Sequence, residues 1–577
     1  MNLWQRMIMT RRYAPFLVLA VAQLVLVLVA PSVGLTTAAN PFGTFGSGDQ
    51  GAATSGTTDS GAAAGGGAAN GTGTGGTNGT GSSASGGGGA GGSAAGRTVA
   101  TNGLGIPTTG DTSHCVNGRQ FGDLPTAPSC VPKWAGGNNG GATYQGVTDK
   151  TIEIVYYREK DNPAVKALEQ QINVYSDPAN QLAFKAAAEK FINARYEFYG
   201  RKVHIDMFFS ASCDPSPPQP ECFKGDVRTL NEQFHPFGVI YENNTAIPGF
   251  FDEATRLGIV SFGGWHFGDN VYNIPRRPFH YDVYMGGDSQ AVITGEYWCK
   301  RLAGLKARFA GDPLLQAKTR KIGIVTVDTP VNVPPAKHLA DIIHGCDPNF
   351  DENKDFLKYS SDITTASQQA GTLVHQLSAD GVTSVMLFGD PIAPVYLTTA
   401  CTGQGYFPEH VLVGSGLIDN DQLGRLYDKN QWKHAFGPSD IPTPLPIDKS
   451  DAGIVWRAGG GSGSVYSAAN LPWSYFNLIA NMLQGAGPHL NPGTLESSAL
   501  SAPAQNEWQN THDQYHAMTV LRPGKYTAIT DQREVYWDAN APSQFDGKPG
   551  SYVPLNGGRR YAPGGWPGGE PTLPAGV

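Results

Sequence analysis

Positive charge is scarce in this sequence of 577 residues. Lysine and arginine together number 41, against 49 aspartate and glutamate residues, and the formal net charge at pH 7 is −8. No stretch of the chain forms the basic stripe that would neutralise a phosphate backbone. We therefore expect no nucleic-acid partner.

The motifs of several common enzyme classes are also missing. No Gly-Lys pair precedes Ser or Thr, as a Walker-type phosphate loop requires, and no His-Glu-x-x-His pattern occurs. The glycine-rich stretch at 459–464 lacks the preceding strand and following helix of a nucleophile elbow. No Cys-x-x-Cys pair or clustered Cys/His spacing predicts a metal site. We expect no catalytic residues, no metal and no cofactor.

Cysteine is sparse, but the spacing of the seven cysteines is informative. Cys115 and Cys130 flank a short loop rich in Gly and Pro, and Cys213 and Cys222 flank a proline-rich segment. Each pair is typical of a small loop closed by a disulfide in an oxidising compartment. Three cysteines remain: Cys299, Cys346 and Cys401. Three cannot all pair within one chain, so we expect the leftover one to be a buried free thiol.

The N-terminus predicts an export signal over residues 1–39. Three arginines precede an apolar run from residue 14 to about 30, and small residues at 37–39 offer a cleavage site. The run is long for a signal peptide but slightly short for a membrane-spanning helix of roughly 20 residues. A cleaved signal peptide and an uncleaved membrane anchor therefore both stay open. In either case we expect an exported chain, located outside the cell or in its envelope.

Residues 40–105 are predicted to be a disordered linker. Gly, Ser, Thr, Ala and Asn dominate this segment, which cannot bury enough apolar surface to offset chain entropy. A Gly-rich coil of this length has an end-to-end distance of about 40–45 Å, enough to hold a folded domain clear of a membrane or wall. A leader without a spacing role is the alternative. Residues 106–143, with the first cysteine pair, are expected to form a disulfide-closed leader segment.

From about residue 144, apolar strands and amphipathic helices alternate. The first series has predicted strands at 151–157, 203–209, 237–241 and 259–262. A second series follows a helix at 289–305, with strands at 322–327, 382–388 and 411–414. Such alternation predicts an α/β fold with mainly parallel sheets, and two series predict two doubly wound, Rossmann-like lobes joined by a hinge. Ligands bind beyond the carboxyl ends of such strands, so the cleft between the lobes is the predicted site.

Six short segments follow one another in the order typical of one protein family. They are 146–154, 199–203, 286–291, 321–327, 378–390 and 533–538. Through them, residues 144–540 resemble the type I periplasmic binding proteins, specifically the branched-chain amino-acid-binding group that serves ABC importers. The resemblance implies three crossings between lobes, with lobe 1 formed by 144–280 and 440–510 and lobe 2 by 281–439 and 511–560. Residues 561–577 are expected to be a tail, and the chain from about Ser543 to be extended and peripheral.

The same resemblance points to two ligand-binding loops in lobe 1. The first contains Asn243, Asn244 and Thr245 after Glu242, and the second contains Gly263, Gly264 and Trp265 before His266. Small polar residues at helix N-termini suit an anionic group such as a carboxylate. Asn244 and Thr245 could instead only cap the following helix. Trp265 departs from the small residues of the family and suggests either a stacking wall for a ring-bearing ligand or an ordinary packed aromatic.

In lobe 2 the family uses the loops after three strands. The corresponding candidates here are Asn332, Asp390 and Asp419, and an aromatic contact of the family is missing beside Asn332. Asp390 or Asp419 could bind a ligand ammonium group. The alternative for each aspartate is a helix cap or a turn residue.

The resemblance implies a solute-binding protein that captures a small molecule, such as an amino acid, an amide or a small acid. Its partners would be that ligand and an ABC-type membrane permease, and an uncleaved N-terminal segment would add contact with the membrane. We expect a monomer and no enzymatic activity. A ligand-sensing or interaction module with the same two-lobed fold is the alternative, and a secreted hydrolase that uses scattered carboxylates is the third hypothesis.

Overall fold

The computed structural model describes residues 100–215, 219–242, 247–265, 268–362, 365–506 and 514–574. The predicted signal segment and nearly all of the predicted linker lie outside these residues. Within the described ranges, no helix is both long and apolar enough to cross a membrane.

The first sheet has five parallel strands in the order β2-β1-β3-β4-β5. Its strands are β1 Thr151–Arg158, β2 Lys202–Phe209, β3 Gly238–Tyr241, β4 Val260–Gly263 and β5 His280–Tyr281. Its connecting helices are α2 Pro163–Gln171, α3 Pro178–Arg195, α4 Pro220–Phe234 and α5 Pro248–Arg256. These helices begin at proline, which has no N–H to leave unpaired in the first turn. Every residue of β3 and β4 is buried, as expected for parallel strands covered by helices.

The second sheet has eight strands and contains the same parallel arrangement. The order is β12-β11-β10-β9-β8-β6-β7, and β13 pairs with β11. The strands are β6 Ile322–Val327, β7 Phe356–Tyr359, β8 Ser384–Phe388, β9 Glu409–Val411, β10 Ala435–Ser439, β11 Gln532–Pro542, β12 Pro549–Pro554 and β13 Arg560–Tyr561. Strands β6 to β10 are parallel, whereas β11 runs antiparallel to its neighbours β10, β12 and β13.

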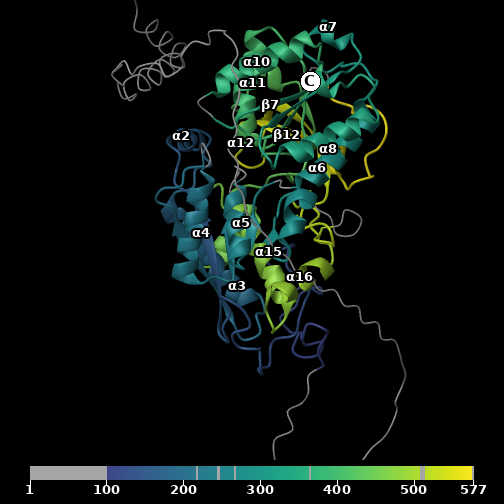
Figure 1. Cartoon of the computed structure of the whole chain (residues 1–577). Helices are drawn as coiled ribbons and strands as arrows, with labels where there is room; N and C mark the ends of the chain where they lie inside the picture. The colour runs from purple at the N-terminus through teal and green to yellow at the C-terminus, as the bar shows by residue number, and fades with distance from the viewer. Residues whose placement is uncertain are drawn as a thin grey trace, which may run out of the picture. The chain divides into compact units, whose positions relative to one another are not determined.

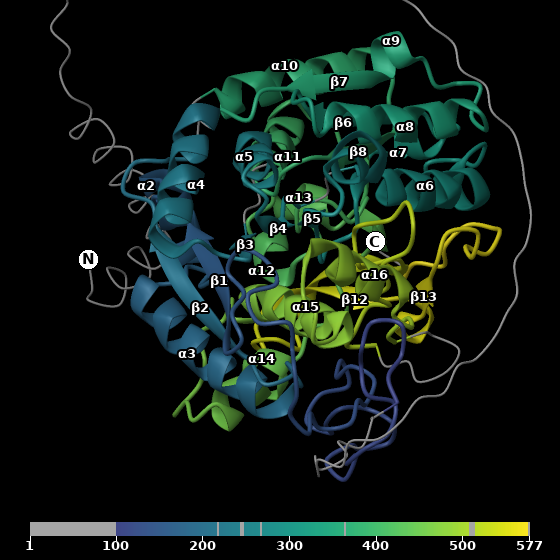
Figure 2. The same ribbon diagram turned by 60° about the horizontal axis from the view of Figure 1, so that its bottom comes forward.

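Helices surround the second sheet as well, and α6 and α8 lie side by side in both views (Figure 1, Figure 2). The helices are α6 Gly287–Tyr297, α7 Pro313–Gln316, α8 Val333–His344, α9 Glu352–Asp355, α10 Ala366–Ala379, α11 Ala393–Gly403, α12 Asp421–Gly424 and α13 Lys429–Trp432. The parallel part of each sheet has its second strand outermost, then the first, third, fourth and fifth, which is a doubly wound order. The predicted α/β fold with two doubly wound sheets is therefore confirmed.

Three helices that follow the second sheet in sequence pack on the first. They are α14 Asp451–Ala458, α15 Asn470–Ala486 and α16 Pro492–Ser501. The Trp473 ring of α15 lies 5.7 Å from the Phe191 ring of α3, and the Phe476 ring lies 5.7 Å from the Tyr156 ring of β1. We call the first sheet with its helices and α14–α16 lobe 1, and the second sheet with its helices lobe 2. The chain passes between the lobes between β5 and α6, between β10 and α14, and between α16 and β11; the residue boundaries stated above stay a prediction.

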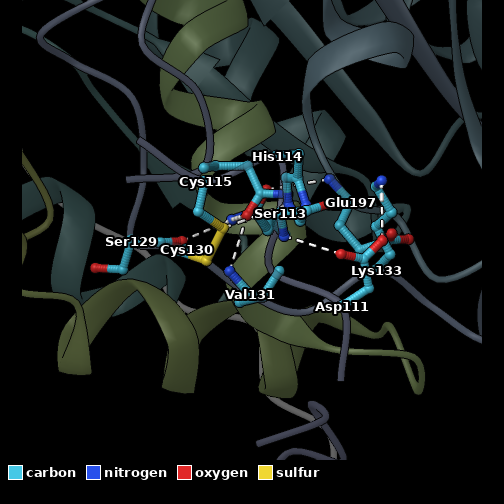
Figure 3. The surroundings of a disulfide bond; sticks show 11 residues. Asp111, Ser113, His114, Cys115, Ser129, Cys130, Val131, Lys133 and Glu197 are labelled. Atoms are coloured by element: carbon cyan, nitrogen blue, oxygen red, sulfur yellow. Dashed lines mark hydrogen bonds and ion pairs between the residues drawn. A yellow bond between two sulfur atoms is a disulfide. The ribbon is translucent and has the colours of Figure 1, made fainter. Parts of the chain in front are cut away.

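Disulfides close both predicted loops. Cys115 pairs with Cys130 (Figure 3) and Cys213 pairs with Cys222. A third disulfide, which the sequence left open, joins Cys299 to Cys346, and Cys401 is a buried free thiol.

The first disulfide belongs to a leader that packs on lobe 1. The Phe121 ring lies 5.6 Å from Phe191 and 5.0 Å from Tyr196. His114 stands beside the bridge, with its Nε2 atom 3.5 Å from Sγ of Cys115 (Figure 3). Because both sulfur atoms of this group form the disulfide, they offer no thiolate to a metal ion.

The expectation of an extended, peripheral C-terminal region is wrong. Strands β12 and β13 both pair with β11, and Trp566 is 2% exposed. The Trp566 ring lies 4.4 Å from Tyr561 and 5.0 Å from Tyr297, and its Nε1 donates to the Ile293 carbonyl over 3.0 Å. Glycine and proline dominate the composition here, but strand pairing and the burial of one large ring attach the segment to lobe 2.

We expect Trp566→Ala to lower the free energy of unfolding by about 3–5 kcal/mol, because it removes a fully buried aromatic side chain. Urea unfolding followed by circular dichroism measures the change. Leu314→Ala is the control, since Leu314 is 74% exposed and its loss should change stability by about 0.5 kcal/mol or less. Equal stability of the two variants would restore the peripheral interpretation.

Candidate ligand-binding cleft

A cavity of about 520 Å³ lies between the lobes. Lobe 1 contributes the end of β1, Glu242 directly after β3, and Trp265 two residues after β4. Lobe 2 contributes Leu417 and residues 419–423, and the crossings contribute 440–445, 515–517 and Thr519 among others. The cavity therefore lies at the carboxyl ends of parallel strands, and its volume is that of a small-molecule site.

A second cavity of about 140 Å³ adjoins the first. It lies at the ends of β6, β7 and β8 in lobe 2, where Val327, Tyr359 and Gly389 line it. Seven residues line both cavities: Glu159, Val165, Glu169, Pro215, Trp265, Pro391 and Ile392. The two cavities are thus compartments of one cleft.

The predicted lobe 1 residues fall into three groups. Asn243, Asn244, Thr245 and His266 lie outside the described residues. Trp265 is 6% exposed, lines both cavities and lies 4.8 Å from the Tyr284 ring. The remaining two, Gly263 and Gly264, line neither cavity.

Backbone conformation explains Gly263. Its φ is +136°, and a Cβ there would collide with the carbonyl oxygen of Tyr241 on the neighbouring strand. Only glycine avoids this clash at the end of β4. A role for Gly263 and Gly264 in ligand binding stays a prediction.

The predicted lobe 2 residues are divided between the compartments. Asn332 and Asp390 line the small cavity, and Asp419 lines the large one. Asp390 accepts the Tyr359 hydroxyl at 2.7 Å and the backbone N–H groups of Ile392 and Ala393 at 2.8 and 2.9 Å. The geometry of Asp390 is thus that of a cap at the start of α11.

Asp419 is 2% exposed, and burial raises its pKa above the usual range of an aspartate. Its neighbour Asp440 is equally buried, and its pKa is raised by burial and by the charge of Asp419. Burial disfavours the ionised form of a carboxyl group. Two buried carboxyls close to one another cannot both carry a full charge at low cost.

Sequence reasoning missed two further carboxyl groups in the cleft. Glu242 accepts the Tyr156 hydroxyl at 2.7 Å, and burial raises its pKa to about 7. Burial also raises the pKa of Glu169, on α2, to about 7. The Glu169 charge raises the pKa of Glu242 further, while Arg158 and the Tyr156 hydrogen bond lower it. Glu242 begins a loop to which the resemblance points, but the sequence pattern does not predict α2 and gave no signal for Glu169.

The Arg158 charge lowers the pKa of both glutamates, but its guanidinium is already bound elsewhere. It donates to Asp161 at 2.6 Å, to Gln181 at 2.7 Å and to the Ser176 carbonyl. The Asp161 carboxylate also contacts Lys166 at 3.0 Å. This cluster of Arg158, Asp161 and Lys166 forms one wall of the large cavity.

The crossings beneath the cavity are hydrogen-bonded to one another. Asp282 of the first crossing donates its N–H to Tyr526 O at 3.0 Å and accepts from Ala528 N at 2.9 Å. The second crossing is joined to the third, because the Thr443 N–H donates to the Gln514 carbonyl at 2.9 Å. Two buried arginines of lobe 2 also bind it. Arg533 donates to Ile441 O at 2.8 Å, and Arg560 donates to Asp440 O at 2.7 Å. Three chain connections that lie side by side and are hydrogen-bonded to one another form the arrangement of a hinge between two lobes.

This chain is similar in structure to solved proteins, but the comparisons of its sequence found no match. No family model matches the chain, and no curated protein matches it. Similar solved structures are substrate-binding proteins of ABC transporters. One from Aeropyrum pernix is 12% identical, with 70% of this chain and 95% of that chain covered at a TM-score of 0.47.

Two further examples have known ligands. The branched-chain amino acid transporter substrate-binding protein of Streptococcus pneumoniae, in complex with isoleucine, is 13% identical (70% and 100% covered, TM-score 0.45). A solute-binding protein from Rhodopseudomonas palustris BisB5, in complex with 3,4-dihydroxybenzoic acid, is 9% identical (72% and 98% covered, TM-score 0.48). We assign the fold from the strand order of this chain itself, and the functional proposal below starts from its cleft.

The hinge predicts a pH dependence of stability. Asp282 is fully buried, accepts the Tyr475 hydroxyl at 2.9 Å, and has its pKa raised by burial to about 8. A carboxyl group whose pKa is raised on folding stabilises the protein below its unfolded pKa of roughly 4, and this contribution is lost as the pH rises to about 8.

We therefore expect Asp282→Asn to gain stability relative to the native chain between pH 5 and pH 8.5, as measured by urea unfolding at both values. Asp328→Asn is the control. Asp328 is 54% exposed and pairs with Lys358, so its removal should change stability equally at both pH values. A pH-independent effect of Asp282→Asn would show that Asp282 is ionised in the folded chain.

Proposed function

We propose that this chain is an extracytoplasmic solute-binding protein that holds a small molecule between its lobes and delivers it to an ABC-type membrane permease. The observation that carries the proposal is the cleft of about 520 Å³ at the carboxyl ends of the lobe 1 strands, closed below by hydrogen-bonded crossings. Lobes joined at one level can close around a ligand and open to release it. The predicted export signal and linker would present this cleft outside the cytoplasm.

The site residues proposed from the sequence fit this cleft in part. Trp265 would form a wall for the ligand between the two compartments, and Asp419 would face it in the larger one. Asn332 and Asp390 would face a ligand group that enters the smaller compartment. Asn243, Asn244, Thr245 and the two glycines stay candidates on the strength of the resemblance.

A hydrolase finds less support in the cleft. His516 and Asp451 line the large cavity with 3.3 Å between Nε2 and Oδ1. The Thr126 hydroxyl donates to Asp451 at 3.0 Å, so this hydroxyl contacts the carboxylate of the pair. A nucleophilic hydroxyl would instead donate to the histidine that takes its proton. A sensing module would use the same cleft, and a neighbouring permease or ATPase gene would favour transport.

Thermal unfolding of the full chain in the presence of candidate solutes tests binding. The panel contains amino acids, amides, short-chain and aromatic acids, sugars and polyamines. We expect one chemical class to raise the melting temperature by a few degrees, since a ligand at about 100 times its Kd stabilises the folded state by roughly 2.7 kcal/mol. The compound should be recovered unchanged. Conversion of the compound would favour the hydrolase, and no shift with any class would count against solute binding.

Trp265→Ala should weaken the binding of a ring-bearing solute by about tenfold more than that of a small aliphatic one, because only the ring stacks on the indole. Isothermal titration of both variants measures the two affinities. Trp134→Ala is the control: Trp134 packs edge-on against Tyr199 at 5.7 Å and lines neither cavity. Equal losses for both solutes would mean that Trp265 only packs.

A further inference from the structure

The lining of the large cavity carries more acidic than basic side chains. Eight carboxyl groups line it: Glu159, Asp161, Glu169, Glu242, Asp419, Asp421, Asp440 and Asp451. Four lysine or arginine side chains accompany them: Arg158, Lys160, Lys166 and Arg533. A cavity lined mainly by one sign of charge concentrates ligands of the opposite sign.

Several of these charges already have partners inside the protein. Asp161 holds both Arg158 and Lys166, at 2.6 and 3.0 Å. Arg533 donates to Ile441 O and to the Thr443 hydroxyl, at 2.8 and 2.6 Å. The basic side chains on these two walls are therefore engaged by protein groups rather than directed to a ligand.

Glu242 and Glu169 line the cavity without an ion pair to lysine or arginine within the described part of the chain. Asp419, Asp421 and Asp440 share this property there, whereas Asp161 does not. The one close contact of the Glu242 carboxyl there is the Tyr156 hydroxyl at 2.7 Å. Both side chains line the large cavity, and Glu169 also lines the small one. They are acceptors that a ligand can reach.

Aromatic side chains surround Glu242. Tyr156, Trp265, Tyr284 and Trp473 line the same cavity, and each of the four is at least nine-tenths buried. Burial raises the pKa of Tyr284, Tyr466 and Tyr475, and the Glu242 charge raises it further, so two more phenol groups, those of Tyr466 and Tyr475, lie near this carboxyl. Aromatic faces attract cations, most strongly where water is excluded.

We propose that the ligand of this cleft is an organic amine whose ammonium group is bound by Glu242 and Glu169 and whose apolar body lies against Trp265. The inference rests on the proposed solute-binding function and specifies its ligand class. It differs from the anionic group expected from helix N-termini in lobe 1. The small compartment would take the far end of the amine, since apolar side chains such as Val325, Leu373 and Leu387 line it.

Proton exchange should accompany the binding of the amine. The groups that face Glu242 are Tyr156 and Arg158 of β1, Glu169 of α2, Tyr284 of the first crossing, Tyr475 of α15, and Tyr466. With the pKa of Glu242 at about 7 in the empty cleft, part of the population is protonated at neutral pH. A bound ammonium favours the carboxylate, so binding releases a proton and strengthens as the pH rises from 6 to 8.

The test uses pairs of probes that share one apolar body and differ in charge. The pairs are 2-phenylethylamine with 3-phenylpropionate, isopentylamine with 4-methylpentanoate, and cadaverine with pimelate. Calorimetric titration of the full chain should show at least one amine binding about tenfold or more tighter than its acid partner. Affinity for that amine should rise from pH 6 to pH 8, with proton release in buffers of different ionisation enthalpy.

Three variants locate the effect. Glu242→Gln keeps an acceptor for Tyr156, and it should weaken amine binding about 10- to 100-fold and reduce the proton release. Glu169→Gln should weaken binding in the same direction and serves if the first variant does not fold. Glu153→Gln, on β1 but outside both cavity linings, makes the same charge change and should leave affinity unaltered.

The outcomes separate the two proposals. An acid that binds as tightly as its amine partner would overturn the cationic ligand and leave solute binding intact. Amine binding that Glu242→Gln and Glu169→Gln do not change would also overturn it. No binding by any of the six probes, together with no shift in the wider solute panel, would count against both proposals.

Discussion

The two lobes are held together by hydrogen bonds among the three crossings of the chain. The first and third crossings pair through backbone groups of Asp282, Tyr526 and Ala528, and the second is bound by the buried guanidinium groups of Arg533 and Arg560. These hydrogen bonds are made to backbone carbonyl oxygens, so they hold the three crossings next to one another where the two lobes meet. The cleft adjoins them, since its lining includes residues of all three crossings. Stability of the crossings and shape of the cleft are therefore coupled.

Strand order then decides what faces the cleft. In both sheets the first strand lies between the second and the third. Because these strands are parallel, their carboxyl ends lie side by side at the same edge of the sheet. In lobe 1 this brings Tyr156, Glu242 and Trp265 to one cavity from β1, β3 and β4. In lobe 2 the same order brings Tyr359 and Asp390 together, at 2.7 Å, from the ends of β7 and β8.

Charge in the cleft follows from burial as much as from composition. Arg158 is committed to Asp161 and to neighbouring oxygens, and so it does not form an ion pair with Glu242 or Glu169 among the described residues. Burial then raises the pKa of both glutamates to about 7, so part of each is protonated at neutral pH in the empty cleft. A cationic ligand favours the ionised form, so it would bind more tightly as the pH rises and the carboxyls lose their protons.

Alternating patterns along the sequence determined the α/β class and both doubly wound sheets, because strands and helices bury residues with different periods. Cysteine spacing likewise determined two of the three disulfides, whose loops are short. Three other features depend on segments far apart in the chain. They are the Cys299–Cys346 disulfide, the burial of Trp566 in lobe 2, and the proximity of Glu169 to Glu242. Only the tertiary structure decided these, because contacts between such segments follow from how whole lobes pack and leave no local pattern in the sequence.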